Sequence, residues 1–239
     1  MKYAFVILIS AAIIMISFSS SRADDEIEKP PNASFGAAGS VSGITAWERK
    51  KGEQHMRYNL TYGYGGGLVF EKMFNNLLGI QSGFWFNRIS LDMRMKEPPD
   101  YFSVDPANLI SVKIVVTGWS VSVPLSLITS FNLSFFSLNI LAGIKYTHIV
   151  QSEARFNNPL MSYKKFFDML PYINQPQFGF TLGVNFKFRV SAYVDLFIGC
   201  SSELHVTELM KGSDDIALLC TLTGVTGVMF RTNVFPMSN

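Results

Sequence analysis

The stretch QFGFTLGVNFKF, residues 177–188, alternates between bulky apolar residues and small or polar ones. Side chains of an extended strand point to opposite faces in turn, so the alternation predicts a β-strand with one apolar and one polar face. In a soluble sandwich the apolar face packs on a protein core, whereas in a membrane barrel it faces lipid and the polar face lines the lumen. The rest of the chain must distinguish these two cases.

The composition favours the membrane case. Of 239 residues, 16% are charged and 14% are aromatic, and phenylalanine alone occurs 21 times. Soluble domains usually contain about 25% charged residues. The formal net charge of +2 comes without a basic stripe, so we expect no nucleic-acid partner.

The N-terminus, MKYAFVILISAAIIMISFSSSRADDE, has the three parts of an export signal: Lys2, an apolar run over 4–16, and small residues at Ser21 and Ala23. The alternative is an uncleaved anchor, but the run is short for a helix that spans a bilayer, which needs ~20 residues. We therefore expect a signal peptide over 1–23, a linker over 24–33 and a barrel domain over 34–235.

Eight segments have strand-like patterns: 34–47, 58–71, 77–87, 110–127, 135–148, 177–188, 190–202 and 216–234. Their connections alternate between short and long, and the long ones hold most of the charges. This alternation is typical of transmembrane barrels, which have tight periplasmic turns and longer outer loops. We predict an all-β, antiparallel, up-and-down transmembrane β-barrel of eight strands, with ten as the alternative count.

The segment 110–127 changes its apolar parity. Val112, Ile114 and Val116 share one face, whereas the apolar residues from Trp119 onward share the other. This change predicts a β-bulge near residues 117–118.

Three stretches resemble a known family: YGYGGGLVFEKMFNNLLGIQSGFWFN (62–87), VSVPLSL (121–127) and FGFTLGVNFKF (178–188). They resemble the glycine-rich strand, the proline-bearing strand and the sixth strand of the PorT-like outer-membrane β-barrel domains, which are related in architecture to OmpA, OmpX and OmpW. The resemblance implies an eight-stranded barrel in the bacterial outer membrane.

Catalytic motifs are weak. His148 with Ser152, or His205 with Ser201 or Ser202, could form the nucleophile and base that some lipid A-modifying barrels use. No motif connects these residues, and all three histidines, including His55, fall in or next to the long connections. We expect no enzyme activity, no metal site and no cofactor.

Four charged residues are expected inside the barrel. We predict that Lys113, Lys145 and Glu203 point into the outer half of the lumen, that Asp195 lies deeper, and that they pair across it. Such a network is either a gated polar path or a structural plug, and an eight-stranded barrel is too narrow for an open channel.

The two cysteines, Cys200 and Cys220, fall on the last two expected strands, on the lipid face. A cross-strand disulfide and two free thiols are both open.

The sequence thus predicts a monomeric outer-membrane barrel with a structural or surface-interaction role. Its partners are the membrane lipids and extracellular or envelope proteins that contact loops 48–57 and 150–175. The alternatives are a soluble exported barrel that binds a small apolar ligand and, less favoured, a lipid A-modifying enzyme.

Overall fold

The computed structural model describes residues 33–49, 56–96, 111–133, 136–157, 165–207 and 216–232. Within them the elements are β1 (Ser34–Arg49), β2 (Met56–Asn59), β3 (Thr61–Met73), β4 (Leu78–Lys96), β5 (Ser111–Asn132), β6 (Phe136–Asn157), β7 (Lys165–Asp168), the 3-10 turn Leu170–Tyr172, β8 (Gln177–Arg189), β9 (Val194–His205) and β10 (Ile216–Arg231). The expected leader and linker lie outside these ranges, apart from Ala33.

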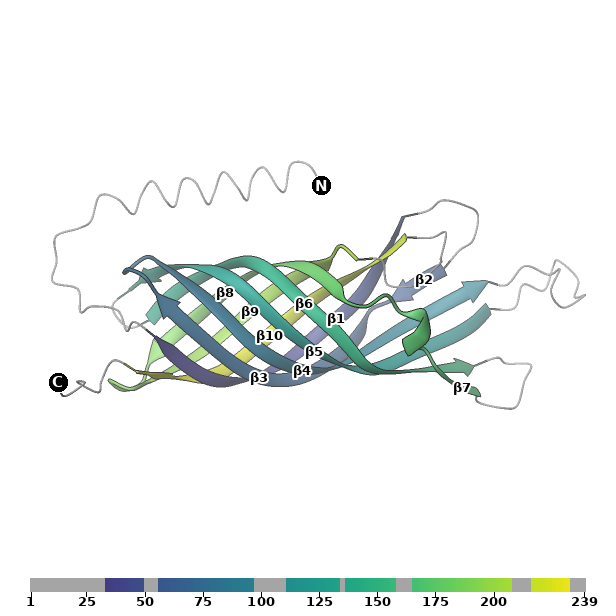
Figure 1. Ribbon diagram of the computed structural model, residues 1–239, viewed down its shortest axis with the longest axis horizontal. Coiled ribbons are helices and arrows are strands. Elements are labelled where there is room, and N and C mark those ends of the chain that lie inside the picture. The colour runs from purple at the N-terminus through teal and green to yellow at the C-terminus, as the bar shows by residue number, and fades with distance from the viewer. Residues whose placement is uncertain are drawn as a thin grey trace, which may run out of the picture.

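Eight of the ten strands in the described ranges form a closed antiparallel barrel (Figure 1). Each wall strand pairs with two other wall strands, and the ring closes through β4–β5 and β1–β10. The two additional strands are short: β2 extends the edge of β3 along β4, and β7 lies above β8 along β6. The prediction of an eight-stranded barrel is therefore confirmed.

The wall is much taller on one side than on the other. Strands β4, β5 and β6 contain 19, 22 and 22 residues, whereas β8 and β9 contain 13 and 12. The short connections, the start of β1 and the end of β10 lie at one end, called the inner end here, and the tall strands project from the other, outer end (Figure 1).

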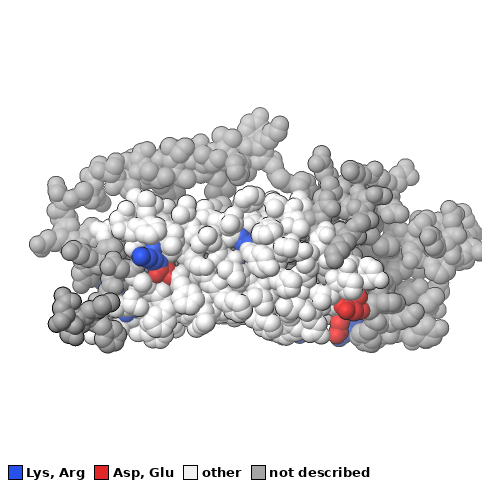
Figure 2. All heavy atoms as spheres, in the orientation of Figure 1, with Lys and Arg blue, Asp and Glu red and all other residues white. Residues whose placement is uncertain are grey.

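The opening stretch, now β8, has its apolar face outside. Phe178 and Phe180 are 49% and 60% exposed, whereas Gln177 and Asn185 are buried inside. The same distribution holds around the barrel, and Figure 2 shows a wide band of its surface nearly free of charged groups. Such a surface suits lipid and not water, because soluble sheets carry charges on their outer faces.

Aromatic side chains gather near both rims of this band. Near the inner end, the Phe35 ring lies 5.6 Å from Phe230. Farther out, the rings of Tyr146 and Phe178 are also 5.6 Å apart. Two aromatic girdles are the usual interfacial anchors of a membrane barrel.

The predicted bulge exists but lies in the neighbouring strand. Trp119 of β5 pairs with Gln151 and Ser120 with Ile149, so that Val150 of β6 is the extra residue. The parity of β5 does not change, and Ile114 and Val116 stay inside as part of an apolar cluster. The inward residues of β5 change from small polar to apolar along the strand. In the sequence this change looks like a change of parity, which is why the bulge was predicted in β5.

The glycines of β3 serve close packing. A Cβ at Gly65 would meet the Asn87 side chain and, at 2.6 Å, the carbonyl oxygen of Phe86. Small residues here therefore leave room for the larger inward side chains of β4.

Candidate functional site: the lumen and the outer end

The lumen contains a polar cavity of about 110 Å³ in its middle. Residues from all eight wall strands line it, and half of them carry hydroxyl or amide groups: Ser40, Ser42, Gln81, Asn87, Ser120, Ser122, Ser126, Thr147, Gln177, Thr181, Asn185, Ser201, Thr221 and Thr223. This volume holds several water molecules.

An ion pair lies along the wall of the cavity near its outer side and passes over the inward face of β8. The Lys145 ammonium on β6 donates to both carboxylate oxygens of Glu203 on β9, at 2.7 and 2.8 Å. The imidazole Nε2 of His205 lies 3.9 Å from the same carboxylate. Next to them in the ladder, Thr147 of β6 lies opposite Gln177 of β8, and both are buried. The result is a compact polar cluster on β6, β8 and β9.

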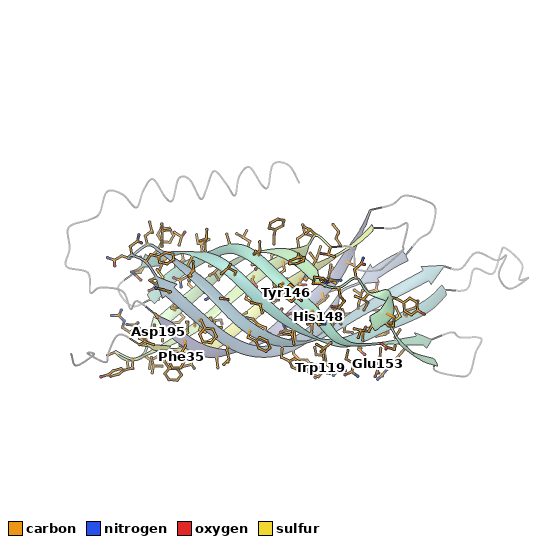
Figure 3. All side chains as sticks on the ribbon, viewed as in Figure 1. Phe35, Trp119, Tyr146, His148, Glu153 and Asp195 are labelled. Carbon is orange, nitrogen blue, oxygen red and sulfur yellow. The ribbon has the colours of Figure 1, made fainter. Side chains whose placement is uncertain are left out.

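Of the other two predicted lumen charges, the structure places Asp195 deeper in the lumen, as expected, and Lys113 outside it. Lys113 lies on the outward face of β5, because the parity of that strand does not change, and its ammonium is 3.0 Å from Asp92 of β4. Asp195 does face inward, but it lies near the inner end (Figure 3) and its carboxylate accepts hydrogen bonds from Arg231 of the adjacent strand. Of the four residues, the structure thus brings Lys145 and Glu203 together, and Lys113 is not in the lumen.

A second ion pair, which does cross the lumen, was not predicted from the sequence. Lys187 of β8 donates to Glu71 of β3, and the two side chains are 10% and 4% exposed. These strands are not neighbours in the sheet, so the pair joins opposite walls. Strand parity could have revealed it, because Glu71 shares the inward face with Gly63, Gly65 and Gly67.

Apolar side chains fill both ends of the lumen. At the outer end, Ile44, Leu91, Ile114, Val116, Ile149, Ala154, Ile173 and Leu219 form one buried cluster. Toward the inner end, Val69, Phe197 and Met229 form a second, and Met73, Ile128 and Leu141 a third. The polar cavity therefore lies between apolar layers.

The segment 169–176, called the strap here, covers the outer cluster. Its Ile173 side chain is 3% exposed within that cluster, and Met169 and Leu170 pack against it. The Gln175 amide accepts from the backbone N–H of Ile149 at 2.9 Å and donates to the carbonyl of the same residue. Gln175 thus fastens the strap beside the bulge, where the ladder is irregular.

The two cysteines are free thiols. In the ladder Cys200 pairs with Gly224, and Cys220 pairs with Leu204. The two positions are therefore four residues apart, or ~13 Å at ~3.3 Å per residue. This exceeds the reach of a disulfide, whose Cα atoms lie within about 7 Å.

The candidate catalytic pairs are separated. His148 is exposed on the outside of β6, whereas Ser152, beyond the bulge, is buried inside. Ser202 faces outward, opposite to His205, and Ser201 lies four residues from His205 on the same face, ~13 Å away. His55 lies outside the described residues.

Within the described part of the chain, His, Cys, Asp and Glu nowhere gather in a group of three or more that could hold a metal ion. The described helices include none long and apolar enough to span a membrane.

A closed antiparallel barrel with a lipid-compatible outer band, aromatic girdles and a polar lumen defines a transmembrane barrel of the outer-membrane class. The family model of the outer membrane protein beta-barrel domain matches residues 19–204. The chain belongs to this family, and the protein is located in the bacterial outer membrane. The alternative of a soluble exported barrel is therefore set aside.

Several solved barrels are similar. Ail of Yersinia pestis, solved with the heparin analogue sucrose octasulfate, is 16% identical, with 84% of this chain and 99% of that chain covered and a TM-score of 0.39. Neisserial surface protein A is 12% identical, with 83% and 97% covered and a TM-score of 0.43. OprG from Pseudomonas aeruginosa is 10% identical, with 87% and 98% covered and a TM-score of 0.46. No curated protein matches the chain.

Proposed function

We propose that this protein is a closed, non-conducting barrel that anchors an interaction surface outside the membrane. The observation that carries the proposal is the tall wall. A tilted strand crosses the membrane with ~9–11 residues, whereas β5 and β6 have 22 residues each. About half of each strand therefore extends beyond the lipid.

This projecting wall is a sheet in its own right. Within the described ranges, β2 and β7 extend it at its two sides, giving the order β2–β4–β5–β6–β7. The backbone of β7 pairs with β6, and within the described ranges its other edge has no strand partner. An edge strand of this kind can bind an extended segment of a partner protein by strand addition. A protein partner outside the cell or in the envelope fits this surface best.

Two observations support the non-conducting part of the proposal. Apolar clusters lie above and below the polar cavity, and the Lys187–Glu71 pair joins opposite walls toward the inner end. The separation of His148 from Ser152 and of His205 from Ser202 supports a role without catalysis.

We also propose that the leader is cleaved after Ala23 and that the barrel acts as a monomer.

A shortened wall tests the interaction role. Because Ser90 pairs with Thr117 in the ladder, a two-residue Asn-Gly turn can replace 91–116, and with it the projecting ends of β4 and β5, without changing the register. We expect covalent cross-linking on intact cells to recover a partner with the full barrel and not with the shortened one. Equal heat-modifiable gel shifts and equal amounts in the outer membrane serve as the control. Recovery of the same partners by both barrels would contradict the proposal.

Planar bilayers test closure. We expect the purified barrel to give no sustained current steps. A steady conductance from the intact chain would show that the lumen is a pore.

A further inference from the structure

An arginine lies on the outer, lipid-side face of the barrel. Arg88 of β4 is exposed, and the ladder places it between Tyr64 of β3 and Trp119 of β5. The three residues are lateral neighbours on adjacent strands, and all three point outward.

The aromatic neighbours hold the guanidinium against the wall. Its central carbon lies 5.7 Å from the centre of the Tyr64 ring, and its Nη1 donates to the Tyr64 hydroxyl at 3.1 Å. The Trp119 ring stacks on Phe86, with centroids 4.7 Å apart and planes 9° from parallel, and meets Tyr64 edge-on at 6.2 Å. Arg88 therefore packs against an ordered cluster of rings. Figure 3 shows that Trp119, a member of this cluster, lies closer to the middle of the barrel than Glu153.

Arg88 lies at the height where the apolar band ends on the outer side of the membrane. Ten residues along β4 separate it from Leu78 at the inner end, or ~25 Å at ~3.3 Å per residue and a tilt of ~40°. The apolar band of such barrels is about 25 Å tall. On the outward face of β4, Phe84 and Phe86 lie below Arg88, and Asp92 lies above it. The change from apolar to charged residues thus occurs at Arg88.

The guanidinium has donors to spare. Of its five N–H groups, one is used by Tyr64. Asp92, the acidic residue nearest along the same face of β4, is bound by Lys113. Among the described residues, no carboxylate pairs with Arg88. A cation at the edge of the hydrocarbon region is costly unless it is paired, and the anions at this depth are lipid phosphates.

We propose that Arg88, framed by Tyr64 and Trp119, binds a phosphate group of a lipid A molecule in the outer leaflet. The planar guanidinium offers two parallel N–H groups to a phosphate, and the rings lie beside the first part of the acyl chains. The proposal rests on the outer-membrane location and is independent of the projecting wall.

Native mass spectrometry of the delipidated barrel, titrated with bisphosphorylated lipid A, tests this site. We expect the wild type to retain one lipid A molecule and Arg88→Gln to bind it with a Kd about tenfold higher, a loss of ~1.4 kcal/mol. Removing the phosphates from the lipid should weaken binding to the wild type by the same factor and leave Arg88→Gln unaffected. Tyr64→Phe keeps the ring and removes the hydroxyl that holds the guanidinium. Its Kd for lipid A should lie between those of the wild type and Arg88→Gln.

Lys72→Gln provides the matched control, because Lys72 is an exposed cation on the neighbouring strand near the inner end. We expect it to bind lipid A like the wild type, with equal gel shifts for all variants. Equal affinity of Arg88→Gln and wild type would overturn the proposal, and so would an equal loss in Lys72→Gln. Equally tight binding of phosphatidylglycerol, or displacement by millimolar inorganic phosphate, would show that lipid A is not the source of the phosphate.

Discussion

Replacing Lys187 with methionine should destabilise the barrel far more than its single charge suggests. The Lys187 ammonium is the hydrogen-bond partner of Glu71 Oε1, and Glu71 Oε2 has no partner among the described residues. The carboxylate, with its side chain only 4% exposed, would therefore lose its counter-charge in the lumen. Breaking a buried pair in this way costs about 3–5 kcal/mol.

The double variant Lys187→Met/Glu71→Leu separates the pair from the volume of its side chains. Because both charges are removed together, we expect most of the stability to return. The coupling energy of the cycle should reach about 3 kcal/mol, at the upper end for contacting residues. Lys72→Met, an exposed lysine next to Glu71 in sequence, should change the free energy of unfolding by less than about 0.5 kcal/mol.

Urea unfolding of the barrel in lipid vesicles, followed by tryptophan fluorescence and by heat-modifiable gel shift, measures these values. A neutral Lys187→Met would show that the lumen is wet enough at this level to screen the carboxylate. A double variant as unstable as the single one would show that packing and not charge dominates.

Three further outcomes follow from the wall and the strap. Leu182→Arg places a charge on the lipid face of β8 near the bilayer midplane, and we expect a loss of about 2–4 kcal/mol in vesicle unfolding. Gln175→Ala removes both hydrogen bonds to Ile149, so protease should cut the strap faster while the gel shift of the barrel persists; an unchanged cutting rate would contradict the anchoring role. Thiol titration of the unfolded chain without reductant should give two thiols, from Cys200 and Cys220, whereas a reductant-dependent increase would reveal a disulfide.

The barrel itself could be predicted from the sequence because period-two alternation and loop length are local properties. Residues 177–188 form β8 with the expected apolar face outside, and six of the other seven expected segments each coincide with a single wall strand. The remaining segment, 58–71, covers most of β3 and half of the short β2. The heights of the strands were harder to predict. The strand predicted over 77–87 continues as β4 to Lys96. Its projecting part was not predicted because its outward residues are polar and lack the lipid-facing pattern.

The lumen network could be predicted in part. Lys145 and Glu203 lie on inward positions of regular stretches of β6 and β9, so parity was sufficient to place them. Lys113 was misplaced because inward apolar residues of the outer cluster imitate a lipid-facing stripe. The partners of a lumen charge depend on which strands meet across the barrel, and shear sets that relationship rather than local sequence.

The extra residue in β6 has a consequence for how the chain tolerates changes in length. Val150 and Gln151 both point outward, while Ile149 and Ser152 both point inward. Deleting Val150 would restore strict alternation and leave every other side chain of β6 on its present side, whereas a deletion within β8 would turn part of that strand inside out. Strand β6 can therefore lose one residue without inverting its other side chains. We expect natural variation in strand length to be tolerated at this position before others.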